Sequence, residues 1–137
     1  MLDEGEYERW MRASKEALTS AEGDLVRGDY NWACFKAQHA AEFAAKALLH
    51  GLGLPAYGHS ISKLLEGAPR EFGFQHVDRQ AKTLDKYYVP TRYPNAWVEG
   101  TPKDYYTRED GEEALRCAEN IVGWVEASWR SLRRGES

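Results

Sequence analysis

The sequence is poor in cysteine and has no long apolar run. Its 137 residues include two cysteines, Cys34 and Cys117, which lie far apart and form no Cys-x-x-Cys pair. That spacing fits neither a disulfide framework nor a zinc site, so we expect two reduced thiols in the core. No stretch approaches the roughly 18 consecutive apolar residues of a membrane span. The longest candidate, residues 37–54, is interrupted by His39, Glu42, Lys46 and His50.

The first residues also lack the features of a secretory signal. Met-Leu-Asp-Glu-Gly-Glu is acidic and no apolar segment follows it, whereas a signal peptide begins with basic residues. The net charge of −4 argues against coating nucleic acid or an anionic membrane by bulk electrostatics. We therefore expect a cytoplasmic protein in which any contact with nucleic acid is local, and no contact with membranes.

No segment shows the alternation of polar and apolar residues that is typical of a half-buried strand. Apolar and small residues instead recur at spacings of three and four, which predicts helices. We expect long helices over residues 2–27, from after Gly28-Asp29 to about Leu52, and from after Thr107 to Leu132, with shorter ones over 60–65 and 77–88. The sequence thus predicts one all-α domain over residues 1–137, a four- to five-helix up-and-down bundle with a frayed tail at 133–137.

Proline is scarce except in one segment before the last helix. Pro90, Pro94 and Pro102 cannot continue a helix and hold the chain around them extended. A long connection of this kind, with no helix of its own, is often functional. We expect a long ordered loop there.

The short motifs of common enzyme classes are absent as well. The sequence has no Walker lysine motif, no Gly-x-Ser-x-Gly elbow and no His-Glu-x-x-His pair. Gly51-Leu-Gly53-Leu-Pro-Ala56 has the letters of a dinucleotide fingerprint but follows a helix instead of a strand. His39 and Glu42 have the spacing of a helical metal pair, yet no second pair exists to face them. We expect no cofactor and no metal.

A polar stripe runs along the second, alanine-rich helix. Gln38, Glu42 and Lys46 recur every four residues on a helix whose other sides are apolar. The stripe can be an ion pair that faces solvent. Alternatively it faces a cleft or a partner, because an unpaired charge in a core costs several kcal/mol.

Basic and aromatic residues gather around the proline segment. Between Arg79 and Arg108 the chain has six basic residues against three acidic ones, interleaved with tyrosines and a tryptophan. Cations pair with phosphate, and flat rings stack on unpaired bases. Most of the rings are expected to pin the loop to the bundle. Arg92 and Tyr93, which stand between two prolines, are expected to bind a ligand.

Several of these segments resemble one family of small prokaryotic helical proteins. They are Gly-Asp-Tyr-Asn-Trp-Ala-Cys-Phe-Lys-Ala-Gln-His-Ala-Ala-Glu at 28–42, Ala-Ala-Lys-Ala-Leu-Leu at 44–49, His59-Ser60, Leu-Asp-Lys-Tyr-Tyr at 84–88, Thr-Arg-Tyr-Pro at 91–94, and Tyr106-Thr107. In order and spacing they resemble the HEPN domain family over nearly the whole chain. The resemblance implies a bundle of four or five helices that forms homodimers, and a separate minimal nucleotidyltransferase as partner, in a module of toxin–antitoxin type.

The resemblance also implies one of two activities, binding of a nucleotide or RNA, or metal-independent cleavage of RNA. The nucleases of the family use an arginine followed four to six residues later by a histidine. Here Arg92 is followed by Tyr-Pro-Asn-Ala-Trp-Val-Glu-Gly, with no histidine in reach. Arg70 and His76 do have five residues between them, in a glycine-broken connector where the family's catalytic helix is not expected to begin.

We therefore expect a homodimer that binds a nucleotide or single-stranded RNA and works beside a nucleotidyltransferase. A ribonuclease toxin and an interaction module without its own ligand are the alternatives. Arg92 would contact phosphate and Tyr93 would stack or donate its hydroxyl. Lys46, oriented by Glu42, would line the floor of the site, with His59 as a further member.

Overall fold

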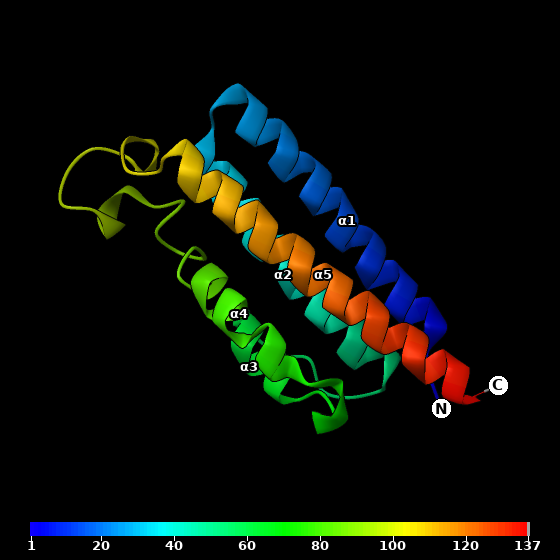
Figure 1. Ribbon diagram of the computed structural model, residues 1–137. Helices are drawn as coiled ribbons and strands as arrows, with labels where there is room; N and C mark the ends of the chain where they lie inside the picture. Colours follow the sequence, from blue (N-terminus) through cyan, green and yellow to red (C-terminus); the bar gives the residue numbers. More distant parts are fainter. Residues whose placement is uncertain (137) are drawn as a thin grey trace.

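A computed structural model describes the backbone of residues 1–136 and the side chains of residues 1–132. It has five α-helices: α1 (Glu4–Arg27), α2 (Tyr30–Gly51), α3 (Ile61–Glu66), α4 (Asp78–Asp85) and α5 (Arg108–Glu136). No strand occurs in residues 1–136, so the predicted all-α class with five helices is confirmed (Figure 1). Most of the tail predicted to fray, 133–137, is helical, because the backbone of residues 133–136 continues α5. Ser137 and the side chains of 133–137 lie outside the described part of the chain.

Helices α1 and α2 form an antiparallel hairpin (Figure 1). The side chain of Asp3 caps α1 by accepting a hydrogen bond from the Glu6 N–H at 3.1 Å. Gly28 ends α1 with a φ of 82°, a left-handed conformation that glycine adopts without strain. The Asp29 N–H then bonds to the Asp24 carbonyl at 2.9 Å, which reverses the chain into α2.

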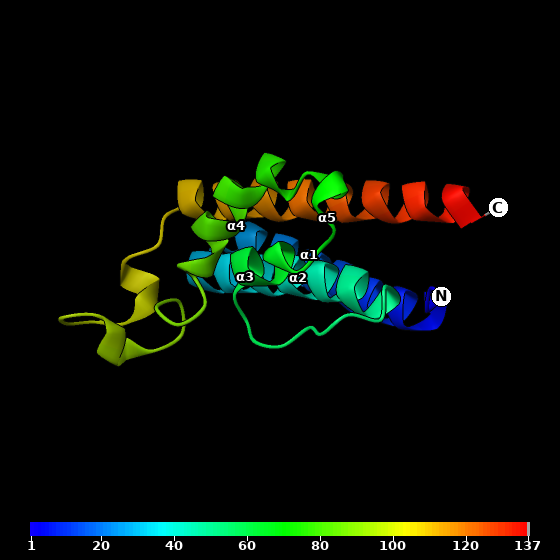
Figure 2. The ribbon, with the colours of Figure 1, turned by 90° about the horizontal axis from the view of Figure 1, so that it is seen from below.

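Helix α5 lies along the hairpin, parallel to α2, so that its two ends meet the corresponding ends of α2 (Figures 1 and 2). Gly111 near its start packs against Leu25 and Ala33, and Trp129 near its end packs against Gly51 and stacks on Tyr7 at 4.2 Å. The small side chains of α2 allow this close approach. Thr107 and Asp110 form the predicted capping box at the start of α5, with hydrogen bonds of 2.9 and 3.2 Å.

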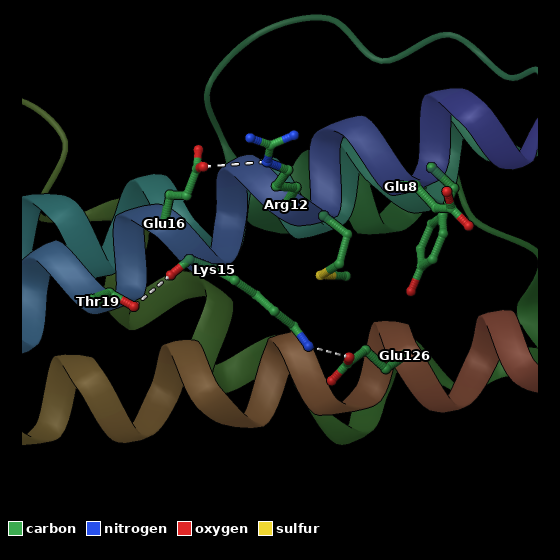
Figure 3. Close-up of a pocket in the computed structure, with 8 residues that line it drawn as sticks. Glu8, Arg12, Lys15, Glu16, Thr19 and Glu126 are labelled. Carbon is green, nitrogen blue, oxygen red and sulfur yellow. Dashed lines mark hydrogen bonds and ion pairs between the residues drawn. The ribbon is translucent and has the colours of Figure 1, made fainter.

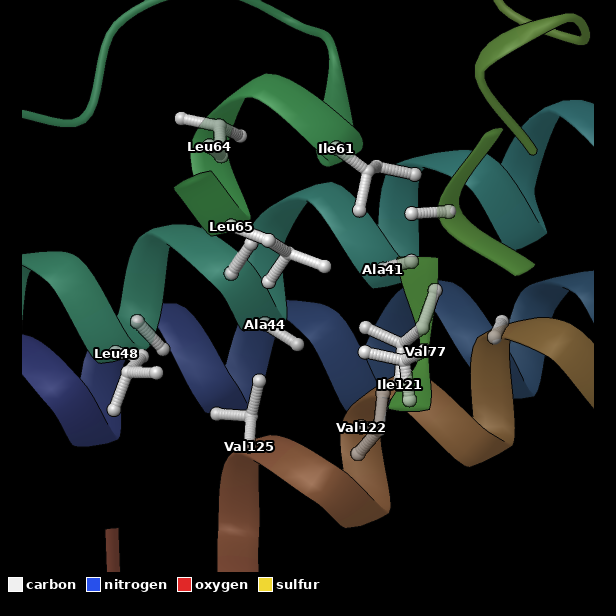
Figure 4. Close-up of a cluster of buried hydrophobic side chains, with 14 of the residues drawn as sticks. Ala41, Ala44, Leu48, Ile61, Leu64, Leu65, Val77, Ile121, Val122 and Val125 are labelled. Carbon is white, nitrogen blue, oxygen red and sulfur yellow. The ribbon is translucent and has the colours of Figure 1, made fainter. Parts of the chain in front are cut away.

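The two short helices cover the rest of α2. Their side chains join α2 and α5 in one core, which Figure 4 shows around Ala41, Ala44, Leu48, Ile61, Leu64, Leu65, Val77, Ile121, Val122 and Val125. Asp85 at the end of α4 accepts hydrogen bonds from the Ile61 and Ser62 N–H groups at 2.6 and 3.2 Å, and from the hydroxyls of Ser60 and Ser62. A carboxylate at a helix N-terminus is favourable, so α3 and α4 are locked together antiparallel.

The connections differ from simple loops. Residues 70–72 and 74–76 form 3₁₀ turns, and Trp124 of α5 donates to the Phe72 carbonyl at 2.9 Å. The segment between α4 and α5 contains two more 3₁₀ turns, Pro94–Ala96 and Pro102–Asp104. Trp97 stacks on Tyr105 at 4.2 Å and donates to the Pro90 carbonyl at 2.8 Å. The long loop is therefore ordered, as predicted. No helix within residues 1–136 is long and apolar enough to span a membrane.

The contact between α2 and α5 gives a prediction for two glycines. A Cβ at Gly51 would lie 2.5 Å from Trp129, whereas a Cβ at Gly123, in the exposed face of α5, would meet nothing within 4 Å. Gly51→Ala should lower the free energy of unfolding by about 1–3 kcal/mol through overpacking. Gly123→Ala should raise it by about 0.5–1 kcal/mol, since alanine is the better helix former. Urea denaturation of both variants checks this, and equal changes of the same sign would contradict the packing.

Candidate functional site

The residues predicted to bind a ligand come from three segments that meet on one side of α2. Glu42 and Lys46 lie on α2, His59 on the segment between α2 and α3, and Arg92 and Tyr93 after α4. Tyr88 connects them, because its ring stacks on His59 at 4.6 Å and lies 4.6 Å from the Arg92 guanidinium. We call this contiguous surface the α2 strip, and it comprises Phe35, His39, Glu42, Lys46, His59, Tyr88, Arg92 and Tyr93.

The guanidinium of Arg92 is held in a fixed plane. Its Nε and Nη2 donate to the Tyr88 carbonyl at 2.9 and 2.6 Å, and it lies over the rings of Phe35 at 4.3 Å and Tyr93 at 5.0 Å. Its Nη1 has no hydrogen-bond partner among the side chains and backbone of residues 1–132. A pre-oriented guanidinium with spare donors suits recognition of phosphate or carboxylate.

The backbone that carries Arg92 is fixed by the preceding residue. Thr91 is buried, its hydroxyl donates to the Tyr87 carbonyl at 2.6 Å, and its carbonyl accepts from Asn31 of α2 at 3.0 Å. Asn31 thus ties the loop to the first turn of α2. The position of Arg92 relative to α2 follows from these bonds.

The polar stripe on α2 is buried, so of the two alternatives the ion pair that faces solvent is wrong. Gln38 is 0%, Glu42 1% and Lys46 9% exposed. The intrahelical ion pair exists, with Lys46 Nζ 3.0 Å from Glu42 Oε2. The chain itself covers the stripe, because His59 Nδ1 lies 3.1 Å from the same oxygen and the His59 carbonyl accepts from Gln38 at 2.9 Å.

His59 differs from the stripe in being accessible. Its side chain is 56% exposed, one ring face lies against Tyr88, and Nδ1 points at the Glu42 carboxylate. When Nδ1 carries the proton and donates to the carboxylate, Nε2 is left as a proton acceptor. Ser60, the next residue, is fixed by Asp85 at 3.0 Å. The pair of Glu42 and His59 is therefore an oriented carboxylate–imidazole dyad on an accessible surface.

His39 lies among these charges. Burial lowers its pKa from the ordinary value of 6.5, the nearby Glu42 carboxylate raises it, and the positive charges of Arg92 and Lys46 lower it further. The lowering dominates, so the imidazole is neutral near pH 7. It packs against Phe35 at 4.5 Å as part of an aromatic face, which indicates a role in packing.

The other candidates lie elsewhere. Arg70 and His76 are exposed on the 3₁₀ turns that pack against α5, not in the α2 strip. Cys34 and Cys117 are buried free thiols, as predicted. Within residues 1–132 no group of three His, Cys, Asp or Glu side chains is arranged to hold a metal ion.

The sequence analysis did not single out Phe35 and Tyr88, whose rings form part of the strip. It also did not single out Asp85, which holds the start of α3 beside the strip. One signal was available, because Phe35 and His39 repeat at the four-residue spacing that places side chains on one helix face. The contacts of Tyr88 with His59 and of Asp85 with residues 60–62 had no such signal, since they join residues that lie 23 or more positions apart.

A cavity of about 610 Å³ lies between α1 and α5 and shares no residue with the strip (Figure 3). Lys15 reaches across it to Glu126 of α5 at 2.7 Å, and Arg12 and Glu16 pair on α1. Its walls combine an apolar floor of Tyr7 and Met11 with a rim of paired charges. Lys15 and Arg12 are both paired, and Glu8 adds a carboxylate at the rim, so the cavity does not favour a small anion.

Comparison with known proteins gives a consistent picture. The model of the HEPN domain matches residues 7–128. A crystal structure of TT1696 from Thermus thermophilus is 44% identical, with a TM-score of 0.85 over 88% of this chain and 96% of that one. ST0689, described as an archaeal HEPN homologue, is 38% identical with a TM-score of 0.76, covering 89% of this chain and 96% of that one. "Putative toxin MJ1304" of Methanocaldococcus jannaschii is 25% identical over 82% of this chain and 81% of its own length.

The position of His39 gives a pH prediction. Its pKa is lowered in the folded state, so the unfolded chain binds the proton more readily and stability decreases as the pH falls. The contribution of neutral His39 is complete above about pH 6.5 and is lost as the pH falls through the lower folded pKa. His39→Phe keeps the ring contacts without the titration. Melting temperatures measured from about pH 8 to about pH 5 should therefore fall less steeply in this variant than in the wild type, and parallel curves would contradict the assignment.

Proposed function

This chain belongs to the HEPN domain family, and from that premise we propose that it is a toxin-like HEPN protein that binds a nucleotide or single-stranded RNA at the α2 strip. In this proposal it acts as a homodimer in the cytoplasm beside a separate minimal nucleotidyltransferase. The alignment with the relative named as a toxin covers most of both chains, and it supports a toxin-like character for this protein. The two buried free thiols fit a reducing compartment.

The observation that carries the binding proposal is the setting of Arg92. Its guanidinium is fixed by the Tyr88 carbonyl, its Nη1 is unpartnered among residues 1–132, and aromatic rings surround it. Phosphate accepts hydrogen bonds from such a group, and an adjacent ring such as Tyr93, 47% exposed, offers a surface for a base. Lys46 lies beneath this surface, with only 11% of its side chain exposed, and would form the floor of the site.

We propose the dimer on the family resemblance. Val98 is 101% and Trp32 43% exposed. Contact with a second copy or with the transferase would cover some of them. The partner is proposed on the family resemblance alone.

Replacement of Arg92 tests the binding site. Arg92→Ala should weaken binding of a nucleoside monophosphate or short oligoribonucleotide by about 10- to 100-fold, because charge-assisted hydrogen bonds contribute roughly 1.5–3 kcal/mol. Lys46→Ala should weaken it less. Arg79→Ala is the matched control, an exposed arginine on α4 from the same basic stretch. Titration calorimetry at moderate salt measures all three, and an unchanged affinity in Arg92→Ala would remove the proposed site.

A specific observation also favours metal-independent cleavage of RNA as a second candidate function. Glu42 and His59 form the oriented dyad described above, and His59 and Arg92 both contact the ring of Tyr88. In such a site the histidine would accept the proton of a ribose 2′-hydroxyl, whose oxygen attacks the adjacent phosphorus. As the bond from phosphorus to the 5′-oxygen of the next nucleotide breaks, that oxygen would take a proton from water, and the hydroxide that remains would take the proton from His59. The products would be a 2′,3′-cyclic phosphate and a free 5′-hydroxyl. Arg92 would stabilise the charged phosphate.

Cleavage assays with single histidine variants distinguish this candidate from binding alone. Purified protein should cut RNA in the presence of EDTA, and His59→Ala should reduce the rate by at least about 100-fold, the lower range for loss of a general base. His76→Ala, which alters the linear arginine–histidine motif outside the strip, should leave the rate unchanged. RNA that stays intact with correctly folded wild-type protein would eliminate the candidate, and loss of cleavage only in His76→Ala would assign it to the connector instead.

A further inference from the structure

The aromatic face of the α2 strip continues beyond Lys46 to the end of α2. Lys46 Nζ lies 5.8 Å from the ring of Trp10 in α1, and that ring stacks on His50 at 4.9 Å and an interplanar angle of 14°. His50 in turn lines a cavity of about 410 Å³ with residues of the following segment: Gly53, Leu54, Pro55, Ala56 and Tyr57. A continuous series of side-chain contacts therefore connects Arg92 with this cavity.

We propose that this cavity is a second base-binding subsite, so that the ligand is a single strand of several nucleotides and not a free mononucleotide. The inference rests on the proposed function and extends it, because it names the class of ligand. In this arrangement Tyr57 and His50 contact one base, and Arg92 binds a phosphate at the other end of the strip.

The chemistry of the cavity fits a flat, weakly polar group. His50 presents an imidazole whose position is fixed by stacking on Trp10, and Trp10 is itself held by a hydrogen bond from Nε1 to Glu6 at 3.1 Å. Tyr57 is 88% exposed and Leu54 37%. Stacking of a base on an aromatic ring strengthens binding with little dependence on which base it is. The volume lies within the range of ligand pockets, about 300–1,000 Å³.

The backbone around Tyr57 leaves the cavity open. Gly53 and Gly58 have φ values of 71° and 89°, and a Cβ at either would meet nothing within 4 Å. These left-handed glycines let the segment turn away from the end of α2 and return along it to His59, a path that Figure 2 shows. The tyrosine is therefore presented outward by the backbone.

The strip is too long for one mononucleotide to reach both of its ends. Phe35, under Arg92, and His50 are separated by 15 positions of one helix, about 22 Å at 1.5 Å per residue. At a stacked rise of about 3.4 Å per nucleotide this distance corresponds to about six to seven nucleotide steps, and to fewer in an extended strand. Between the ends lie the rings of His39 and Phe43, 5.0 Å apart, and Lys46.

Oligonucleotides of different length test the inference. Binding of AMP and of oligoadenylates of about three, six and nine nucleotides is measured by calorimetry with wild-type protein, Tyr57→Ala, Tyr57→Phe and Arg92→Ala. We expect affinity to rise up to about six nucleotides and then to level off. Tyr57→Ala should weaken binding of the hexamer by about 5- to 100-fold and leave AMP unaffected, and Tyr57→Phe, which keeps the stacking ring, should bind the hexamer as the wild type does.

The alternative outcomes separate this inference from the proposed function. One outcome is that AMP and the hexamer bind equally, that Arg92→Ala weakens the binding of both, and that Tyr57→Ala weakens the binding of neither. In that case the second subsite is refuted and the site at Arg92 stands. If no ligand binds wild-type protein, the proposed function fails and the inference with it. If Tyr57→Ala halves the mass measured by light scattering, the cavity is a contact between copies of this chain, and the inference is overturned.

Discussion

The candidate site depends on one buried carboxylate. Glu42 is 1% exposed and accepts from Lys46, His59 and Gln38 at 3.0, 3.1 and 3.3 Å. A buried charge of this kind is tolerated only when nearly all of its oxygen lone pairs are engaged, since the loss of hydration costs several kcal/mol. The covering segment is drawn onto α2 by that requirement, and His59 takes its position as a consequence. The same carboxylate therefore stabilises the fold and orients the more accessible imidazole of the strip.

A second carboxylate connects this arrangement to the rest of the bundle. Asp85 engages the first turn of α3 immediately after His59, while the residues after Asp85 carry Tyr88. The stacking of Tyr88 on His59 is thus a contact between two segments that Asp85 already holds together. Arg92 is placed one turn of chain further on by hydrogen bonds to the Tyr88 carbonyl. Each group of the strip is positioned by backbone that is itself bonded, which is the preorganisation that binding sites require.

The sequence predicts the long helices well, because their apolar spacing is a local property. The caps of α3 and α5 at Ser60 and Thr107 follow equally from local chemistry. The burial of Glu42 is not local, since it is caused by a glycine-rich segment without periodicity that folds back over α2. The 3₁₀ turns between α3 and α4 could not be predicted for the same reason, since their segment has no periodicity. Arg92 can be singled out from its neighbours in sequence, whereas its ring partner Phe35 lies on another helix and becomes visible only in three dimensions.

These contacts also explain how a protein of net charge −4 can present a local site for an anion. Glu42 and Lys46 neutralise each other below the surface, which leaves the Arg92 guanidinium as the fixed charge that faces outward in the strip. The imidazole of His59 stacks on the tyrosine ring beside that guanidinium. Aromatic rings separate these groups from one another. Most of the strip is therefore flat apolar surface, and its net charge is small. For the function proposed above, that balance disfavours double-stranded nucleic acid, whose bases are already stacked and whose phosphates demand many cations, and it favours a strand with free bases.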